Sequence, residues 1–170
     1  EIGSSSIAKW AAEHKEMLAC DLILVSDTTM SSEKVPCING GRRGLAYLEV
    51  EVTGPDKDLH SGHYGGAVYN PINALCDMIH SLIDEKGHIT VKGFYDDVVE
   101  LSAEDRALLG RAPFDLEEFK RGIGVDAVKG EEGYTTLERP GIRPCLDVCG
   151  IWGGYTGSGG KTEIPSKATA

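Results

Sequence analysis

Basic residues are scarce in this chain. Its 170 residues include 17 Lys and Arg against 27 Asp and Glu, a formal net charge of −10. The basic residues never cluster beyond Arg42 and Arg43, so the chain lacks the cationic surface that binds phosphate backbones. We therefore expect no nucleic-acid partner. Apolar runs are also short, the longest being Leu22 to Val25, far below the roughly 20 residues that span a bilayer. Since no signal segment opens the chain either, we expect a soluble, cytoplasmic protein with no membrane partner.

Cysteine pairs with CxxC spacing are absent too. The chain has an odd number of cysteines, which are Cys20, Cys37, Cys76, Cys145 and Cys149. This pattern predicts neither a disulfide framework nor a zinc knuckle, and reduced, mostly structural thiols are expected. Cys149 stands beside Gly150 in an expected strand. Because no partner base is identifiable, a buried thiol is favoured there over a catalytic one.

The first region of the chain predicts half of an α/β unit. Serines at positions 4–6 offer N-cap oxygens, and apolar residues then recur at helical spacing up to Leu18. Residues 21–27 form a short apolar run without alternation, typical of a strand buried on both faces of a parallel sheet. Asp27 ends this strand, where α/β proteins place their chemistry, although a capping or turn Asp explains the spacing equally well.

The second region has a different pattern. Residues 28–44 are rich in small and polar residues and predict a domain boundary, after which Leu45–Thr53 alternates as a half-buried antiparallel strand does. Asn70 and Pro71 predict the start of a helix that ends before Gly87. Further expected elements are helices at Ser102–Leu109 and Asp115–Lys120 and strands at Ile89–Phe94, Leu146–Trp152 and Thr162–Ala170. The mixture predicts an α+β fold, an antiparallel sheet with helices on one face.

A histidine-containing, glycine-rich loop at residues 58–66 is the densest polar feature. His60 and His63 are three residues apart, but a local metal site would need a third ligand that is not nearby. A hydrogen-bonded loop histidine is the simplest alternative. The remaining interpretation is a loop that presents one imidazole to a site elsewhere.

A second glycine-rich segment, residues 153–162, is similar to a phosphate loop but differs in two respects. Tyr155 stands where the motif needs glycine, and the residues after Thr162 predict a strand instead of the required helix. Ser158 is no nucleophile elbow either, because that pattern needs glycine at Thr156. We therefore expect a loop between two antiparallel strands.

Taken together, these motifs resemble one known family. They occur in the order of the two-metal exopeptidases and deacylases, which include carnosinase, cytosolic nonspecific dipeptidase, aminoacylase and succinyl-diaminopimelate desuccinylase. The matching pieces are Glu1–Ser4, Val25–Asp27, Asp58–Gly62 with Gly65 and Gly66, Asn70–Pro71, and Gly159–Pro165. The resemblance implies that residues 1–37 are a fragment of the catalytic domain. Residues 38–170 would be the lid and dimerisation domain, incomplete at its C-terminus.

The resemblance also implies roles for individual residues. Glu1 and Asp27 match ligands of two zinc or manganese ions. His60 matches the lid histidine that stabilises the developing oxyanion in the partner subunit's site, and Thr162 matches a lid residue near the substrate. Cys149 stands where mammalian dipeptidases carry histidine. Since the other metal ligands and the general base fall outside the chain, we expect these residues alone to hydrolyse nothing and to bind no stoichiometric zinc.

The function implied is that of a homodimeric, metal-dependent dipeptidase. A water activated by two metal ions would attack the peptide bond of a small peptide beside its free carboxylate. Two alternatives stay open. The protein could be an N-acyl amino acid deacylase of the same family, or a noncatalytic dimerisation module that pairs through an exposed strand or the helix after Asn70.

Overall fold

The computed structural model describes residues 4–25, 30 and 33–170. It divides into two compact units, residues 1–39 and 40–170, and each is described by itself. Among the described residues, none of the helices is both long and apolar enough to cross a bilayer.

The described residues of the first unit contain one short helix, α1 (Ile7–Glu13). The predicted helix reached Leu18, but residues 14–18 form turns. The physical reason is that its apolar side chains find little to pack on: Ile7 stays 60% exposed, and a short helix without tertiary packing is marginal. The buried strand predicted at residues 21–27 is also wrong over residues 21–25, which form no strand and leave Leu22 83% exposed. Asp27 lies outside the described residues.

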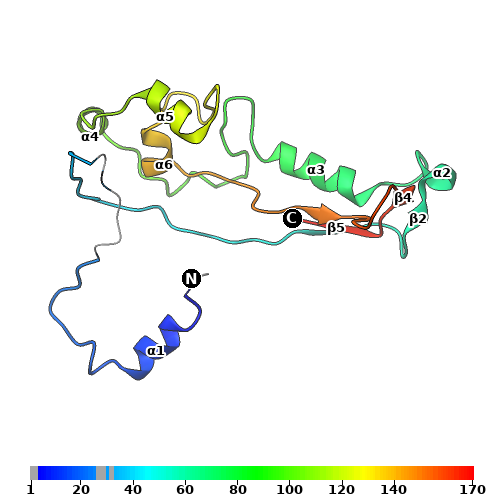
Figure 1. Ribbon diagram of the computed structural model, residues 1–170, viewed down its shortest axis with the longest axis horizontal. Helices are drawn as coiled ribbons and strands as arrows, with labels where there is room; N and C mark the ends of the chain where they lie inside the picture. The colour runs from blue at the N-terminus through cyan, green and yellow to red at the C-terminus, as the bar shows by residue number, and fades with distance from the viewer. Residues whose placement is uncertain (1–3, 26–29, 31–32) are drawn as a thin grey trace. The chain divides into compact units, whose positions relative to one another are not determined.

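The second unit is α+β, as expected. Its three-stranded antiparallel sheet has the order β1 (Glu51–Thr53), β5 (Lys167–Thr169), β3 (Trp152–Gly153). A second sheet pairs β2 (Leu59–His60) with β4 (Glu163–Ile164), also antiparallel. Figure 1 shows β2 and β4 next to α2 (Ser61–Tyr64), the turn of helix that follows β2 directly.

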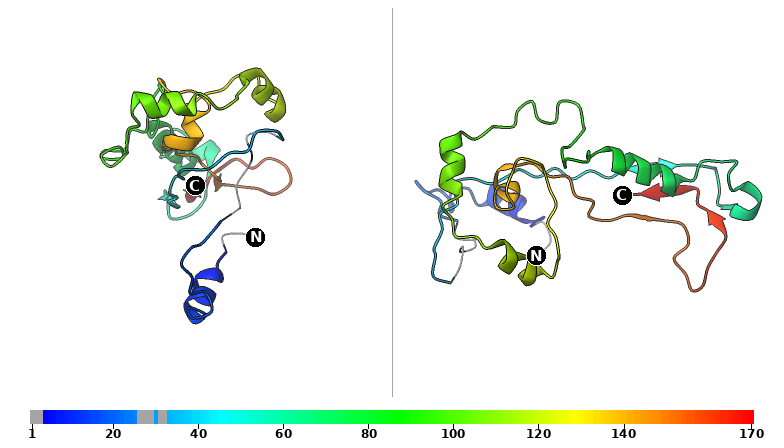
Figure 2. Two further views of the ribbon diagram at one scale, coloured as in Figure 1. Left: turned by 90° about the vertical axis from the view of Figure 1, so that its left-hand side faces the viewer. Right: turned by 90° about the horizontal axis from the view of Figure 1, so that it is seen from above.

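Helix α3 (Pro71–Ser81) covers the three-stranded sheet (Figure 2). Its start confirms the prediction, since Asn70 accepts a hydrogen bond from the Ile72 amide at 2.9 Å and Pro71 occupies the first turn. Leu75 of α3 is 1% exposed. Ile89, Ile164 and Ala168 are buried as well.

Three more helices follow: α4 (Ala103–Leu109), α5 (Leu116–Ile123) and α6 (Glu138–Ile142). The first two were predicted from their caps, and the Ser102 and Asp115 side chains do accept from amides three residues on. Helix α5 is followed by Gly124, whose φ of 71° favours glycine. Helix α6 was not predicted from the sequence.

The predicted strands are shorter in the structure. Leu45–Thr53 is strand only at Glu51–Thr53, preceded by a pair of backbone hydrogen bonds between Val50 and Ala170. Residues 45–49 form no strand and have no strand partner among the described residues. Ile89–Phe94 is wrong as a strand, because it makes one bridge, Ile83 to Ile89, and then turns. Of Leu146–Trp152 only Trp152 is strand, while Thr162–Ala170 divides into β4 and β5.

Candidate functional site

His60 and Thr162, 102 residues apart in the sequence, meet in the structure. The pairing of β2 with β4 sets Leu59 opposite Ile164 and His60 opposite Glu163. One residue further along, the Ser61 amide donates to the Thr162 carbonyl at 3.1 Å. The side chains follow the backbone, so that His60 Nε2 lies 3.2 Å from Thr162 Oγ1. The structure thus brings together two of the four residues for which the sequence predicted roles.

The imidazole of His60 is held at its other nitrogen as well. His60 is the N-cap of α2, and its Nδ1 accepts a hydrogen bond from the Gly62 amide at 2.9 Å. His60 remains exposed, and its ring forms a T-shaped pair with the ring of His63 at a centroid distance of 4.9 Å. A ring fixed at both nitrogens yet open to solvent can act as an oriented hydrogen-bond donor.

Asp58 ties the start of this loop to the opposite strand segment. Its Oδ1 accepts from the Ser166 amide at 2.8 Å. This hydrogen bond is the main cause that lowers the pKa of the Asp58 carboxyl, with a weaker contribution from the charge of Lys161. The residues Asp58, His60, Gly62, Thr162 and Ser166 are called the His60 corner below. Sequence reasoning noted Asp58 and Gly62 only as members of a motif and missed these contacts.

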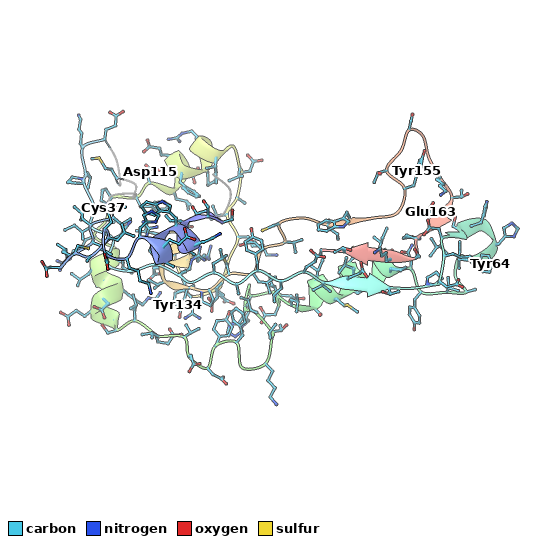
Figure 3. The ribbon with its side chains drawn as sticks, turned by 90° about the horizontal axis from the view of Figure 1, so that it is seen from below. Cys37, Tyr64, Asp115, Tyr134, Tyr155 and Glu163 are labelled. Atoms are coloured by element: carbon cyan, nitrogen blue, oxygen red, sulfur yellow. The ribbon has the colours of Figure 1, made fainter. Side chains whose placement is uncertain are left out.

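The glycine-rich segment 153–162 is a loop from β3 to β4, as the sequence predicts. No helix follows Lys161 in this described part of the chain, so the amides lack the arrangement of a phosphate loop. Lys161 instead forms an ion pair with Glu163, which raises the pKa of Lys161, and lies 5.5 Å from the centre of the Tyr155 ring. Figure 3 labels Tyr155 on this loop and Glu163 at the strand beside α2.

An open groove of about 710 Å³ lies next to the His60 corner. Residues from α2, α3, β4 and the segment between α2 and α3 line it, among them Ser61, Gly65, Tyr69, Asn73, Asp77 and Glu163. Ser61 and Glu163 are the chain neighbours of His60 and Thr162. The groove therefore adjoins the exposed imidazole without containing it.

The predicted metal ligands are not brought together by what the structure describes. Glu1 and Asp27 both lie outside the described residues. Within residues 4–25, 30 and 33–170, no group of three or more His, Cys, Asp or Glu side chains is arranged to hold a metal ion. His60 and His63 therefore form no local zinc site with a third ligand there.

Cys149 corrects another expectation. The sequence favoured a buried thiol, but Cys149 is exposed, and the Tyr47 hydroxyl donates to its sulfur at 3.9 Å. It lies outside a strand, because the predicted strand at residues 146–152 has no backbone partner before Trp152 in the described structure. The other cysteines are exposed as well, and none of them forms a disulfide within the described part of the chain.

A second polar network, missed from the sequence, lies among the helices. Arg143 is 4% exposed and donates to both carboxylate oxygens of Glu131 at 2.7 Å and to Glu100 at 2.6 Å. Arg106 binds both oxygens of Glu138, at 2.7 and 3.1 Å. These five residues are called the Arg143 cluster. Figure 1 shows α4, α5 and α6 grouped at the end of α3 that lies away from α2, so the cluster is remote from His60.

Pairing shifts the ionisation of the Arg143 cluster strongly. Hydrogen bonds from Arg106 lower the pKa of Glu138 to about 2, and those to Glu131 raise the pKa of Arg143. Thr135 adds a reciprocal pair: its amide donates to Glu138 Oε2 at 2.7 Å, and the Glu138 amide donates to Thr135 Oγ1 at 3.2 Å. These reciprocal hydrogen bonds are those of a capping box in the turn that leads into α6, and the spacing Thr-x-x-Glu is the signal that could have predicted this helix.

Comparisons with known proteins agree with this architecture. Residues 40–170 match the model of the peptidase dimerisation domain. The chain is 33% identical over 157 residues to the Cys-Gly metallodipeptidase dug1 of Schizosaccharomyces pombe, covering 92% of this chain and 33% of that protein. It is 34% identical over 169 residues to the Beta-Ala-His dipeptidase of Homo sapiens, covering 98% of this chain and 33% of that protein.

Solved structures give the same result. Human carnosine dipeptidase 1 superposes with a TM-score of 0.81 at 32% identity, over 99% of this chain and 36% of that chain. The M20 family metallo-carboxypeptidase Sso-CP2 of Sulfolobus solfataricus gives a TM-score of 0.78 at 32% identity, over 96% of this chain and 42% of that chain. The chain spans about a third of the length of the curated relatives that it matches. With the fold, the antiparallel pairing and the family model in agreement, the chain belongs to the family of M20 peptidase dimerisation domains.

Proposed function

We propose that this chain is part of a homodimeric, metal-dependent dipeptidase to which it contributes His60 as a transition-state donor and Thr162 as a substrate contact. The relatives are named as dipeptidases, and the matched domain is named for dimerisation. The observation that supports the role best is the exposed imidazole of His60, held by Gly62 at one nitrogen and by Thr162 at the other.

Glu1 and Asp27 are the proposed metal ligands, in a catalytic-domain fragment at residues 1–37 that precedes the lid and dimerisation domain at 38–170. Carboxylates suit zinc and manganese alike. Two such cations would polarise the scissile carbonyl and activate the attacking water when bound. The described residues do not fit the ions by themselves, because no cluster of three ligands exists among them. What these residues contribute to the reaction therefore rests on His60 and Thr162.

His60 would act where negative charge develops on the carbonyl oxygen. An N–H group aimed at that position stabilises the transition state more than the ground state, and loss of one such donor typically costs about 100-fold to 1000-fold in turnover. His60 is exposed on residues 40–170, the dimerisation domain, so a second subunit can receive it. We place the protein in the cytoplasm, because an odd number of cysteines without CxxC spacing suits a reducing compartment.

The test uses the complete protein, stripped of metal by a chelator and then restored with zinc or manganese. Recovered hydrolysis of free dipeptides would support the proposal. Activity confined to N-acyl amino acids would assign the protein to the deacylases instead. Failure of both reactions in a protein that still sediments as a dimer would point to a noncatalytic dimerisation module.

A further inference from the structure

The two nitrogens of the His60 ring have partners of different kinds. The Gly62 amide can only donate, and it lies 2.9 Å from Nδ1. A ring nitrogen that accepts a hydrogen bond carries no proton, so in the neutral ring the proton belongs to Nε2. Nε2 then donates to Thr162 Oγ1 at 3.2 Å. One backbone amide thus selects the tautomer of the proposed donor.

Position 62 also controls where the ring lies. A Cβ atom built on Gly62 would lie 2.8 Å from His60 Cε1 and 3.0 Å from Nδ1, closer than side chains tolerate. Any residue other than glycine would therefore push the imidazole away from the amide. Gly160, two residues before Thr162, makes a useful contrast, since a Cβ there meets nothing within 4 Å.

We propose that Gly62 is a positioning residue: its amide and its lack of a side chain hold the neutral His60 ring as an Nε2–H donor for the developing oxyanion. The inference rests on the proposed role of His60. Two observations carry it independently of the family resemblance, the Gly62 to Nδ1 hydrogen bond and the absence of room for a Cβ. When substrate binds, the Nε2–H group would donate its hydrogen bond to the substrate carbonyl oxygen instead of the Thr162 hydroxyl. The proton stays on the ring throughout.

The first test reads the tautomer directly. The complete protein is labelled with ¹⁵N-histidine, and its nitrogen shifts are recorded at a pH where the rings are neutral, with His60 assigned by the signal lost in His60→Gln. We expect a protonated Nε2 and a bare Nδ1. A proton on Nδ1 would overturn the proposal, whatever the activity of the enzyme.

The second test compares Gly62→Ala with Gly160→Ala. Displacement of a catalytic group by about 1 Å costs on the order of 100-fold, so Gly62→Ala should lower kcat by about 10-fold to 100-fold with little change in KM. The His60 nitrogen shifts should move toward a mixture of tautomers. Gly160→Ala should match the wild type in both measurements.

Wild-type turnover and wild-type shifts in Gly62→Ala would contradict the positioning role. The proposed function can fail separately. If the wild type shows the Nε2–H tautomer but His60→Ala keeps its turnover, His60 has no catalytic role, and the effect of Gly62 on the tautomer still stands. If Gly62→Ala does not fold, the tautomer of the wild type still decides the proposal.

Discussion

The two polar networks of residues 40–170 differ in how far their central side chains are exposed to solvent. In the Arg143 cluster, a cation that is 4% exposed makes three hydrogen bonds of 2.6 to 2.7 Å to two carboxylates. In the His60 corner, an exposed imidazole makes two hydrogen bonds of 2.9 and 3.2 Å. The first network pairs its buried cation internally. The second fixes a donor in direction and leaves it accessible.

This difference predicts where stability and activity reside. Breaking a buried charge pair typically costs about 3 to 5 kcal/mol, because the remaining charge stays buried without its partner. Removing an exposed hydrogen bond costs about 1 kcal/mol. Substitutions in the Arg143 cluster should therefore change folding, whereas those in the His60 corner should change turnover.

The largest effect is expected from His60→Ala in the complete protein. Loss of an oxyanion donor should lower kcat by about 100-fold to 1000-fold, while the unfolding temperature and the dimer stay as in the wild type. Steady-state kinetics on a dipeptide and analytical ultracentrifugation provide the measurements. The matched control is His63→Ala, which changes the neighbouring ring but removes neither hydrogen bond of His60. Unchanged turnover in His60→Ala would assign the chain to a noncatalytic module.

Arg143→Met should show the opposite behaviour. It leaves Glu131, whose side chain is 10% exposed, without its main partner, and we expect a loss of about 3 kcal/mol in the free energy of unfolding. The folded fraction should keep its turnover. Calorimetry and kinetics on the same preparation test both statements. Lys86→Met is the control, because its ion pair with Glu132 is exposed at both ends and should be worth well under about 1 kcal/mol. Equal losses of unfolding free energy in Arg143→Met and Lys86→Met would contradict the proposed difference between buried and exposed ion pairs.

The parts of the fold that the sequence predicted are those governed by local rules. Asn70 with Pro71, Ser102 and Asp115 begin α3, α4 and α5, because a cap acts within a few residues of itself. Strand lengths depend on partners far along the chain. Alternation at residues 45–49 predicted a strand, but these residues pair with no strand among the described residues. Helix α6 was not predicted, because it contains Pro140 and Gly141, which are unfavourable in helices; the reciprocal hydrogen bonds between Thr135 and Glu138 lie at its start.

The candidate site was predictable only in part. The roles of His60 and Thr162 came from a resemblance, and they stay predictions, as do those of Glu1 and Asp27. That His60 and Thr162 touch depends on the register of β2 against β4, which no local pattern specifies. The hydrogen bond from Gly62 depends on the conformation of a single turn of helix. Periodicity cannot predict either contact, because both arise from backbone placement.

Acid should weaken the Arg143 cluster selectively. Hydrogen bonds from Arg106 hold the pKa of Glu138 at about 2, below its ordinary value of 4.5. A lowered pKa stabilises the folded state above the ordinary value, and this contribution disappears as the pH falls from about 4.5 to about 2. Glu138→Gln should thus be less stable than the wild type at neutral pH, and the difference should shrink toward pH 2. Unfolding by urea across this range tests it, with the exposed Glu117→Gln as control. A difference independent of pH would contradict the assignment.

The smallest effect is expected from Thr162→Val, which keeps the side-chain shape and removes the hydroxyl that accepts from His60 Nε2. The Gly62 contact remains and still selects the tautomer, so the ring loses only one of its two restraints. A hydrogen bond with a net value of about 0.5 to 1.5 kcal/mol corresponds to a fall of about 2-fold to 10-fold in kcat/KM. Thr162→Ser restores the hydroxyl and should recover the wild-type value. If valine and serine behaved alike, Thr162 would act through its methyl group and not through His60. If Thr162→Val lost as much activity as His60→Ala, the hydroxyl would contact the reacting atoms itself, and the His60 corner would contain two catalytic residues.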